Sequence, residues 1–232
     1  MTIIVERGKD RHEMDYYETP FAFAATTLCH IPCQSKFVKT ALDPGAGRGI
    51  WGKALRLYNT EAYLEGVEIQ PFGDIEADVD ELSKTYNKYW HDDFLTWEAQ
   101  HNYDLIVGNP PYKLAHEFVD KCLDLLAPNG QLVFLLRLAM LESQKRYNTW
   151  WTHSPIKKVI VSPKRISFTG DGRSDDTAYA VFVWQDGFDG TPTIDWMWWD
   201  YDIIPQMPTT ISGWDVNLYP EWHYKSIEQE GK

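Results

Sequence analysis

Residues 40–58 constrain the fold of this chain most strongly. A short stretch at residues 40–42 leads into Asp-Pro-Gly-Ala-Gly-Arg-Gly over residues 43–49. Apolar residues then recur at helical spacing over residues 50–58. Glycines such as Gly45 and Gly47 allow tight turns and close approach of a ligand to the backbone. The pattern predicts a strand, a glycine-rich loop and a helix, an arrangement that by itself also serves dinucleotide binding.

The remainder of the chain alternates between segments typical of strands and segments with helical periodicity. Apolar runs typical of strands lie at residues 62–69, 103–107, 131–136, 156–161 and 178–184, and helical patterns at 21–39 (interrupted at Pro32), 114–126 and 140–151. This alternation predicts an α/β fold with a doubly wound, mostly parallel sheet. Such sheets bind ligands at the carboxyl ends of their strands. Periodicity fades after Trp184, and an acidic, Trp-rich segment follows.

Charge is distributed unevenly along the chain. The net charge is −12, which taken alone argues against a nucleic-acid partner. However, residues 137–173 sum to +6, whereas residues 1–136 and 174–232 each sum to −9. The basic segment is either a solvated lysine face or a surface for phosphates. Charge alone does not separate these two interpretations.

The sequence contains no recognisable targeting signal and no metal-binding motif. The N-terminal residues are charged, and no apolar run reaches the ~20 residues that a membrane helix requires, so we expect a cytoplasmic protein without membrane contact. Cys29, Cys33 and Cys122 have no second Cys/His cluster nearby. We therefore expect reduced thiols and no metal site.

Three carboxylates, two of them at the ends of predicted strands, suggest a nucleoside-like ligand. Asp43 precedes the glycine loop, where it would repel a pyrophosphate and attract an ammonium group. Glu68, ending the second strand, can accept hydrogen bonds from both ribose hydroxyls. Asp93 can accept from an adenine amino group, and Phe94 can cover the ring. Each residue also has an ordinary interpretation, as a turn residue, a solvated strand end or a turn cap.

The sequence Asn-Pro-Pro-Tyr at residues 109–112 is the most specific motif. An exocyclic amine on an aromatic ring is a poor nucleophile because its lone pair is delocalised. The side-chain oxygen of Asn109 and the backbone oxygen of Pro110 can accept its two hydrogens and favour a tetrahedral nitrogen. The prolines stiffen the loop, and Tyr112 offers a face for stacking. A rigid strand-to-helix turn is the alternative interpretation.

These motifs, in this order, resemble the amino-directed S-adenosylmethionine-dependent methyltransferases, especially the DNA adenine-N6 enzymes. The resemblance covers roughly residues 17–184 and includes a Tyr-Glu-Thr-Pro element at residues 17–20. It implies a Rossmann-like class I methyltransferase fold with a seven-stranded sheet. The catalytic domain would span residues 1–185, and residues 186–232 would form the acidic appendage.

The resemblance also implies a role for each matching position. S-adenosylmethionine would be the cofactor, and a target base in DNA would be flipped into the site for direct in-line transfer without a metal. The catalytic residues would be Asn109, Pro110 and Tyr112. The cofactor-binding residues would be Thr19, Pro20, Asp43, Gly45, Gly47, Glu68, Asp93, Phe94 and Asn109. The substrate-binding residues would be Tyr112 and, by a loose match of residues 165–168, Arg165 and Phe168. Lys164 is added to them as a member of the basic segment 137–173.

Two other functions remain open from the sequence. The Asn-Pro-Pro-Tyr geometry serves any planar amine or amide, so RNA adenine or a protein glutamine could be the target. A non-catalytic interaction protein on the same fold is the third hypothesis, although an intact loop and motif argue against it. The larger DNA enzymes carry a separate target-recognition domain that is not evident here, so the sequence predicts no target sequence. It predicts no oligomeric state either.

Overall fold

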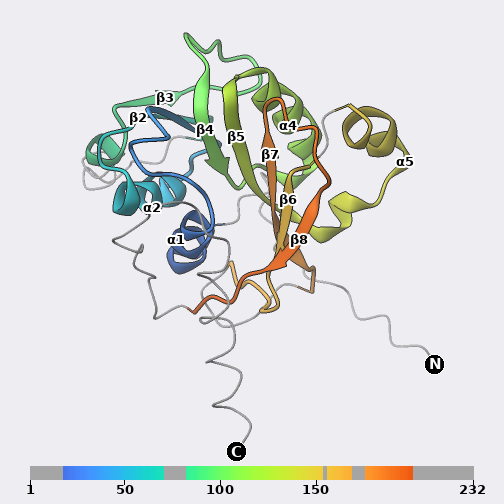
Figure 1. Cartoon of the computed structure of the whole chain (residues 1–232). Helices are drawn as coiled ribbons and strands as arrows, with labels where there is room; N and C mark the ends of the chain where they lie inside the picture. Colours follow the sequence, from blue (N-terminus) through green and yellow to red (C-terminus); the bar gives the residue numbers. More distant parts are fainter. Residues whose placement is uncertain (1–17, 71–81, 154–155, 169–175, 201–232) are drawn as a thin grey trace, which may run out of the picture.

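A computed structural model describes residues 18–70, 82–153, 156–168 and 176–200 (Figure 1). Its helices and strands follow in the order α1 (Phe21–Cys29), β1 (Thr40–Pro44), α2 (Ile50–Tyr58), β2 (Tyr63–Glu68), β3 (Lys88–His91), β4 (Tyr103–Gly108), η1 (Tyr112–Leu114), α4 (Ala115–Asp124), β5 (Leu126–Arg137), η2 (Leu138–Leu141), α5 (Gln144–Arg146), η3 (Tyr147–Trp151), β6 (Lys158–Val161), β7 (Tyr179–Gln185) and β8 (Thr193–Trp196).

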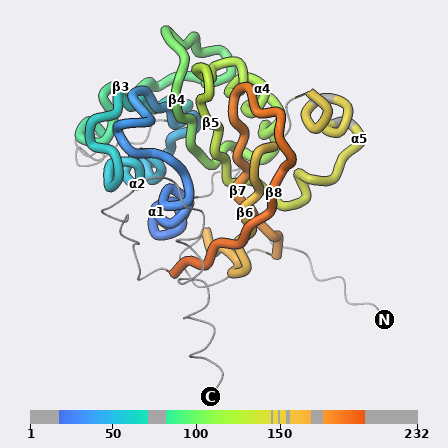
Figure 2. Tube along the Cα trace, in the orientation of Figure 1, coloured from blue at the N-terminus to red at the C-terminus, as the bar shows by residue number. Residues whose placement is uncertain are grey.

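The strands form a single sheet in the order β3-β2-β1-β4-β5-β7-β6-β8. All neighbouring pairs are parallel except those that β7 makes with β5 and β6, so β7 alone runs against the others. Figure 2 shows the chain crossing from blue and cyan on the β3 side to orange on the β8 side. The predicted doubly wound, mostly parallel α/β fold is confirmed, with eight strands among the described residues instead of seven.

Each face of the sheet is covered by its own helices. On one face, α1 and α2 pack against sheet residues such as Leu105 and Val107. On the other, α4 and η3 pack against residues such as Ile106. Successive residues of the central strand β4 thus point into opposite cores, as strand geometry requires. Because helices cover both faces of the sheet, side chains on both sides of the central strands are buried. These strands therefore contain continuous apolar runs in the sequence.

Two predicted helices differ from the structure. The helix expected over residues 21–39 ends at Cys29, shortly before Pro32, which has no N–H for a helix. Residues 140–151 form η2, α5 and η3 instead of one helix. Ser143 caps α5 by accepting from the backbone N–H of Arg146, and the Arg146 guanidinium donates to the carbonyls of Ala139, Met140 and Glu142. These bonds turn the chain where a continuous helix was expected.

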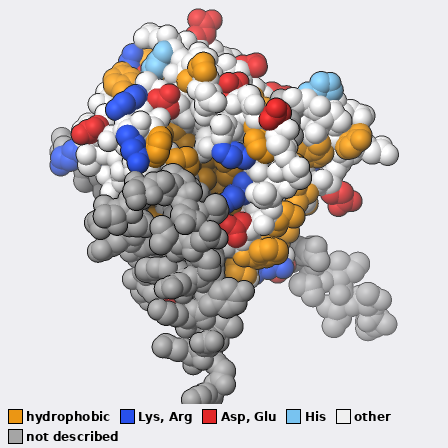
Figure 3. Space-filling view, in the orientation of Figure 1, with side chains coloured by type: hydrophobic (Ala, Val, Ile, Leu, Met, Phe, Trp, Pro, Cys, Tyr) orange, Lys and Arg blue, Asp and Glu red, His pale blue; other side chains and the backbone are white. Residues whose placement is uncertain are grey.

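The eighth strand comes from the segment expected to be an appendage. β8 pairs with β6, and the residues after it, Met197 and Trp199, are buried in the core beside α1. Ile194, Trp196 and Trp198 alternate with them and are exposed, matching the hydrophobic groups on the β8 side of Figure 3. The first part of the segment is therefore continuous with the sheet. A domain boundary at residue 185 remains a prediction, and residues 201–232 lie outside the described residues.

No helix in the described ranges is long and apolar enough to cross a membrane. Cys29, Cys33 and Cys122 are buried free thiols. Burial raises the pKa of Cys33 to about 12, and it also raises the pKa of Cys29 and Cys122. The three thiols are therefore protonated core side chains.

Candidate active site

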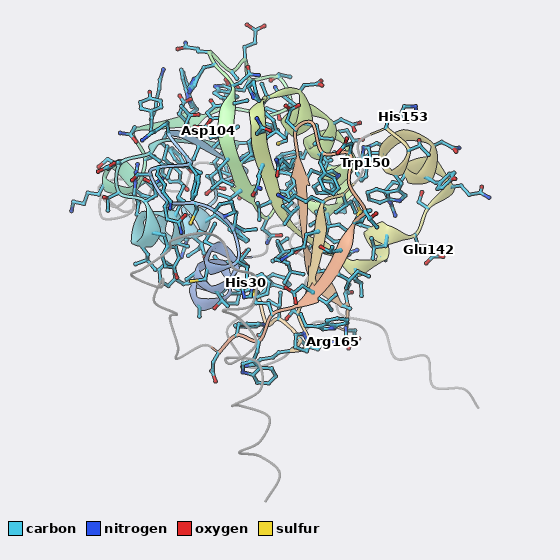
Figure 4. The ribbon with its side chains drawn as sticks, viewed as in Figure 1. His30, Asp104, Glu142, Trp150, His153 and Arg165 are labelled. Carbon is cyan, nitrogen blue, oxygen red and sulfur yellow. The ribbon has the colours of Figure 1, made fainter. Side chains whose placement is uncertain are left out.

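A cavity of about 380 Å³ lies where β1, β2 and β4 end. Its wall includes the glycine loop, the turn after β3 and the start of η1. In Figure 4, Asp104, near the start of β4, lies at one end of the sheet, and Arg165, which follows β6, lies at the other. The parallel strands run from the first of these ends to the second. Residues lining the cavity are Glu18, Thr19, Gly45, Ala46, Gly47, Arg48, Ile50, Trp51, Val67, Glu68, Ile69, Gln70, Asp93, Phe94, Asn109, Pro111, Lys113, Leu114 and Phe118.

The glycine loop lies close to the end of β2. The backbone N–H groups of Gly45 and Ala46 both donate to the Val67 carbonyl, at 2.8 and 3.0 Å. Gly45 and Gly47 have φ values of 69° and 53°, in the left-handed region that favours glycine. The loop sequence thus supplies the conformation that brings its backbone to the cavity wall.

Glu68 fixes the same loop from β2. Its Oε2 accepts from the Gly47 N–H at 2.8 Å and its Oε1 from the Gln70 N–H at 2.8 Å. Burial raises the pKa of Glu68, against the lowering effect of these backbone hydrogen bonds. Each carboxylate oxygen can accept a second hydrogen bond, so a ribose diol is still a suitable ligand.

Asp43 does not line the cavity. It is fully buried, and its Oδ2 accepts from the Gly52 N–H of α2 at 3.2 Å and from the Tyr86 hydroxyl at 2.6 Å. Its Oδ1 has no hydrogen-bond partner among the described residues. Desolvation raises the pKa of Asp43 to about 7. In this structure, Asp43 therefore lies behind the loop and joins β1 to the first turn of α2; direct contact with a cofactor ammonium stays a prediction.

Asp43 should make stability depend on pH. Its folded pKa of about 7 lies above the ordinary 3.8, so its contribution to stability is present in acid and is lost as pH rises through about 7. The raised pKa of Glu68 acts in the same direction. We expect the melting temperature of the ligand-free protein to fall between about pH 4 and about pH 7 and to level off above that, an effect on the order of 4 kcal/mol for Asp43.

Asp43→Asn should remove much of this slope, as measured by thermal melts across the same pH range. Asp124→Asn, which removes an exposed carboxylate on α4, is the matched control and should keep the original slope. If Asp43→Asn also keeps it, the buried carboxylate is not its source.

Asp93 and Phe94 lie in the turn after β3, a strand that the sequence analysis did not predict, and both line the cavity. Asp93 Oδ1 accepts from the Leu95 N–H at 2.9 Å. The Phe94 ring is buried against Phe118, with centroids 4.9 Å apart. Lys121 of α4 holds this turn by donating to the carbonyls of Phe94, Leu95 and Trp97.

The cavity wall combines polar and aromatic side chains. Thr19 and Trp51 line it, although Thr19 Oγ1 and Trp51 Nε1 are themselves buried and lack hydrogen-bond partners within the described ranges. Glu68, Asp93 and Phe94 line the same cavity, a combination that suits a polar organic ligand. Pro20 caps α1 just outside this lining.

The Asn-Pro-Pro-Tyr segment follows β4 directly. Asn109 and Pro111 line the cavity, whereas Pro110 is buried behind it. The Tyr112 ring lies 5.4 Å from the Tyr179 ring, and the Arg137 guanidinium lies 5.1 Å from the Tyr112 centroid. The motif thus spans from the cavity wall to a group of aromatic rings beside it.

Phe168, the loosest of the sequence matches, belongs to that group. Its ring meets Tyr179 edge-on, with centroids 5.1 Å apart. Tyr179 therefore joins Phe168 to Tyr112 in an aromatic row formed by three separate segments of the chain. Tyr179 and Arg137 had not been identified from the sequence, because a strand tyrosine and a strand-end arginine have no signature of their own.

The basic segment is largely engaged in contacts within the chain. Lys158 lies 3.5 Å from Asp195, Lys164 lies 3.9 Å from Asp200, and Arg165 donates to the Asp176 carbonyl at 2.6 Å. Lys157 donates to Gln185, and Arg146 binds three carbonyls, as described above. Lys164 and Arg165 lie outside the cavity lining, so their contact with a substrate stays a prediction.

The sequence missed several lining residues, including Trp51 and Phe118. Both occupy helix positions that periodicity assigns to a core. Trp51 is in the first turn of α2, and the Phe118 ring lies 3.6 Å from the position that a Cβ on Gly45 would take. No sequence signal distinguishes such a core aromatic from one that also closes a cavity.

Comparisons with known proteins agree with this geometry. Residues 24–148 match the family model of the methyltransferase small domain. A tRNA1(Val) (adenine(37)-N6)-methyltransferase of Aliivibrio fischeri is 40% identical over 78 residues, covering 31% of this chain and 32% of that protein. The type II methyltransferase M.CvrRI of Paramecium bursaria Chlorella virus XZ-6E is 29% identical over 124 residues, covering 44% of this chain and 31% of that protein.

One solved structure supports the fold. A Listeria monocytogenes protein described as a class I S-adenosylmethionine-dependent methyltransferase superposes with a TM-score of 0.61 at 15% identity, covering 81% of this chain and 68% of that one. The curated relatives are matched over about a third of their own length.

Proposed function

Because the chain belongs to the methyltransferase small domain family, we propose that it methylates the N6 amino group of adenine in DNA. The family uses S-adenosylmethionine, which supplies an electrophilic methyl group on a sulfonium. The observation that carries the proposal is the position of Asn109, at the end of β4 on the cavity wall, with Tyr112 leading into the aromatic row.

The residues of this chain supply binding and orientation. Glu68, Asp93 and Phe94 line the cavity, where the two carboxylates would hold the ribose and the adenine of the cofactor and Phe94 would cover the adenine ring. The Asn109 side-chain oxygen and the Pro110 carbonyl accept hydrogens from the target amine, which directs its lone pair toward the cavity. Tyr112 and Phe168 stack on or beside an extruded base. No ionisable side chain is required to activate the amine.

RNA is the second candidate substrate. The relative that is 40% identical acts, by its name, on adenine 37 of a tRNA, whereas M.CvrRI is a type II methyltransferase. The first of these names supports adenine as the target base. We favour DNA because the viral relative is matched over more of this chain and because residues 137–173 are basic.

Labelled S-adenosylmethionine, incubated with separate pools of DNA, RNA and protein, tests the proposal. We expect label in the DNA pool. Label in the RNA pool alone would establish the second candidate, and label only in protein would contradict a nucleic-acid substrate. Heat-denatured protein is the control for non-enzymatic transfer.

The basic segment provides a separate prediction about DNA binding. Because phosphate contacts release counterions, affinity should fall steeply with salt. Replacing Lys157, Lys158, Lys164 and Arg165 by Gln should weaken binding to duplex DNA and flatten the salt slope by about 1 for each lost contact. Titrations at two salt concentrations measure both quantities.

The matched control removes four positive charges elsewhere, by replacing Lys36, Lys39, Lys53 and Lys84 with Gln. It should leave the salt slope unchanged. Thermal melts must show that the first variant is folded, because it also loses the contacts to Asp195 and Asp200. A folded variant with unchanged affinity and slope would contradict the assignment of this segment to DNA.

A further inference from the structure

Tyr86, just before β3, lies behind the glycine loop and contacts the elements on either side of it. It is 4% exposed, and its hydroxyl donates to Asp43 Oδ2 at 2.6 Å. Within the described part of the chain, the one other donor to this carboxylate is the Gly52 N–H, at 3.2 Å on the same oxygen. The Tyr86 hydroxyl is therefore the shorter of two bonds that hold a fully buried carboxylate.

The Tyr86 ring fills space that side chains would otherwise occupy. A Cβ on Gly52 of α2 would lie 2.6 Å from the ring, and a Cβ on Gly66 of β2 would lie 2.9 Å from it. Both distances are shorter than real Cβ contacts, so α2 and β2 approach the ring this closely only because both positions are glycine. The Tyr86 ring thus sets the distance between α2, which follows the loop, and β2, which supports the loop.

A second tyrosine holds the loop itself. The Tyr89 hydroxyl donates to the Gly47 carbonyl at 3.0 Å, and its ring centroid lies 5.5 Å from that of Tyr86. The short segment before and within β3 therefore contacts the loop region at two points, Asp43 and Gly47. Neither tyrosine belongs to a recognised motif of the sequence.

We propose that Tyr86 is a positioning residue for the cofactor site, holding the Asp43 carboxylate and the spacing between α2 and β2 that keep the glycine loop in its binding shape. This inference rests on the proposed placement of S-adenosylmethionine in the 380 Å³ cavity. Tyr86 does not line that cavity and acts through Asp43 and the loop.

The hydrogen bond from Tyr86 has a measurable electrostatic consequence. The pKa of Asp43 is raised to about 7 by desolvation and, to a smaller extent, by the negative charge of Glu68, against the lowering effect of the Tyr86 and Gly52 hydrogen bonds. Without the Tyr86 hydroxyl, the pKa of Asp43 should rise, because the charged form loses a donor. If the charged form organises the loop, cofactor affinity should decline below a pH midpoint that moves upward in the variant.

The test is Tyr86→Phe, which keeps the ring and removes the hydroxyl. Binding of S-adenosylhomocysteine is measured by calorimetry from about pH 5.5 to about pH 8. We expect affinity about tenfold lower near neutral pH, the usual size for losing a hydrogen bond to a charged group. We also expect the pH midpoint of binding to lie higher than that of the unmodified protein.

Tyr103→Phe is the matched control. The Tyr103 hydroxyl donates to the buried carboxylate of Glu65 at 2.5 Å, so this variant loses the same kind of bond in the same sheet. Neither residue lines the cavity or contacts the loop. Affinity and midpoint should stay within about twofold of the unmodified protein, since the lost bond lies away from Asp43.

The outcomes separate the inference from the function it rests on. Absence of binding to the unmodified protein would contradict the proposed function. If that protein binds, equal affinity and midpoint in Tyr86→Phe would overturn the positioning role, as would equal losses in both variants. If Tyr86→Phe does not fold, Tyr89→Phe decides: weaker binding with an unchanged midpoint supports the role of this segment, and unchanged affinity overturns it.

Discussion

Asn109→Ala is expected to reduce methyl transfer by about 100- to 1000-fold, the usual range for removing one preorganised polar group that acts on the reacting centre. Asn109 follows the last residue of β4 and lies on the cavity wall, next to the segment that leads to the aromatic row. Its loss leaves the Pro110 carbonyl as the only motif oxygen assigned to the target amine. Affinity for S-adenosylhomocysteine should change by less than about tenfold, because the other wall residues remain.

Transfer is measured under single-turnover conditions and binding by calorimetry. Asn102→Ala is the matched control: Asn102 precedes β4 at its opposite end, where its side chain donates to the Leu126 carbonyl. It should retain nearly full transfer. An Asn109→Ala protein that keeps most of its activity on every nucleic acid tested would contradict the assigned mechanism.

Tyr112→Ala should be the second most damaging change, lowering transfer by about 10- to 100-fold, since stacking on a base contributes about 1–3 kcal/mol. The ring contacts both Tyr179 and the Arg137 guanidinium, so its removal also opens the aromatic row. Tyr112→Phe keeps the ring and should retain activity within about threefold, because the proposed role is stacking.

The two substitutions are compared by kcat and KM on the same substrate. Tyr147→Ala, which removes an exposed aromatic on η3, controls for non-specific loss of a surface ring. Equal damage in Tyr112→Phe and Tyr112→Ala would assign the function to the hydroxyl and contradict stacking.

The sequence predicted those parts of the site whose chemistry is local. The glycine loop, the acid at the end of β2 and the Asn-Pro-Pro-Tyr turn each lie within a few residues of a strand end, and parallel strands bring such ends to one edge. Periodicity likewise predicted central strands such as β4 and β5, because each contains a run of consecutive apolar residues.

Other features depend on contacts between distant segments. Tyr86 meets Asp43 from 43 residues away, and its importance depends on glycines in two further elements. β8 has only four residues, with an exposed Ile194 and Trp196, so it resembles a surface segment until it pairs with β6. The basic charges of residues 137–173 were counted correctly, but the acidic partners that several of them meet lie beyond residue 174.

The most direct test of the central claim identifies the methylated atom. The protein is incubated with unmethylated duplex DNA and S-adenosylmethionine carrying a deuterated methyl group, and the DNA is digested to nucleosides for mass spectrometry. We expect deuterated methyl on deoxyadenosine, at N6, in an amount that Asn109→Ala lowers by about 100- to 1000-fold. Label on a different nucleoside, or no labelled nucleoside from DNA, would contradict it.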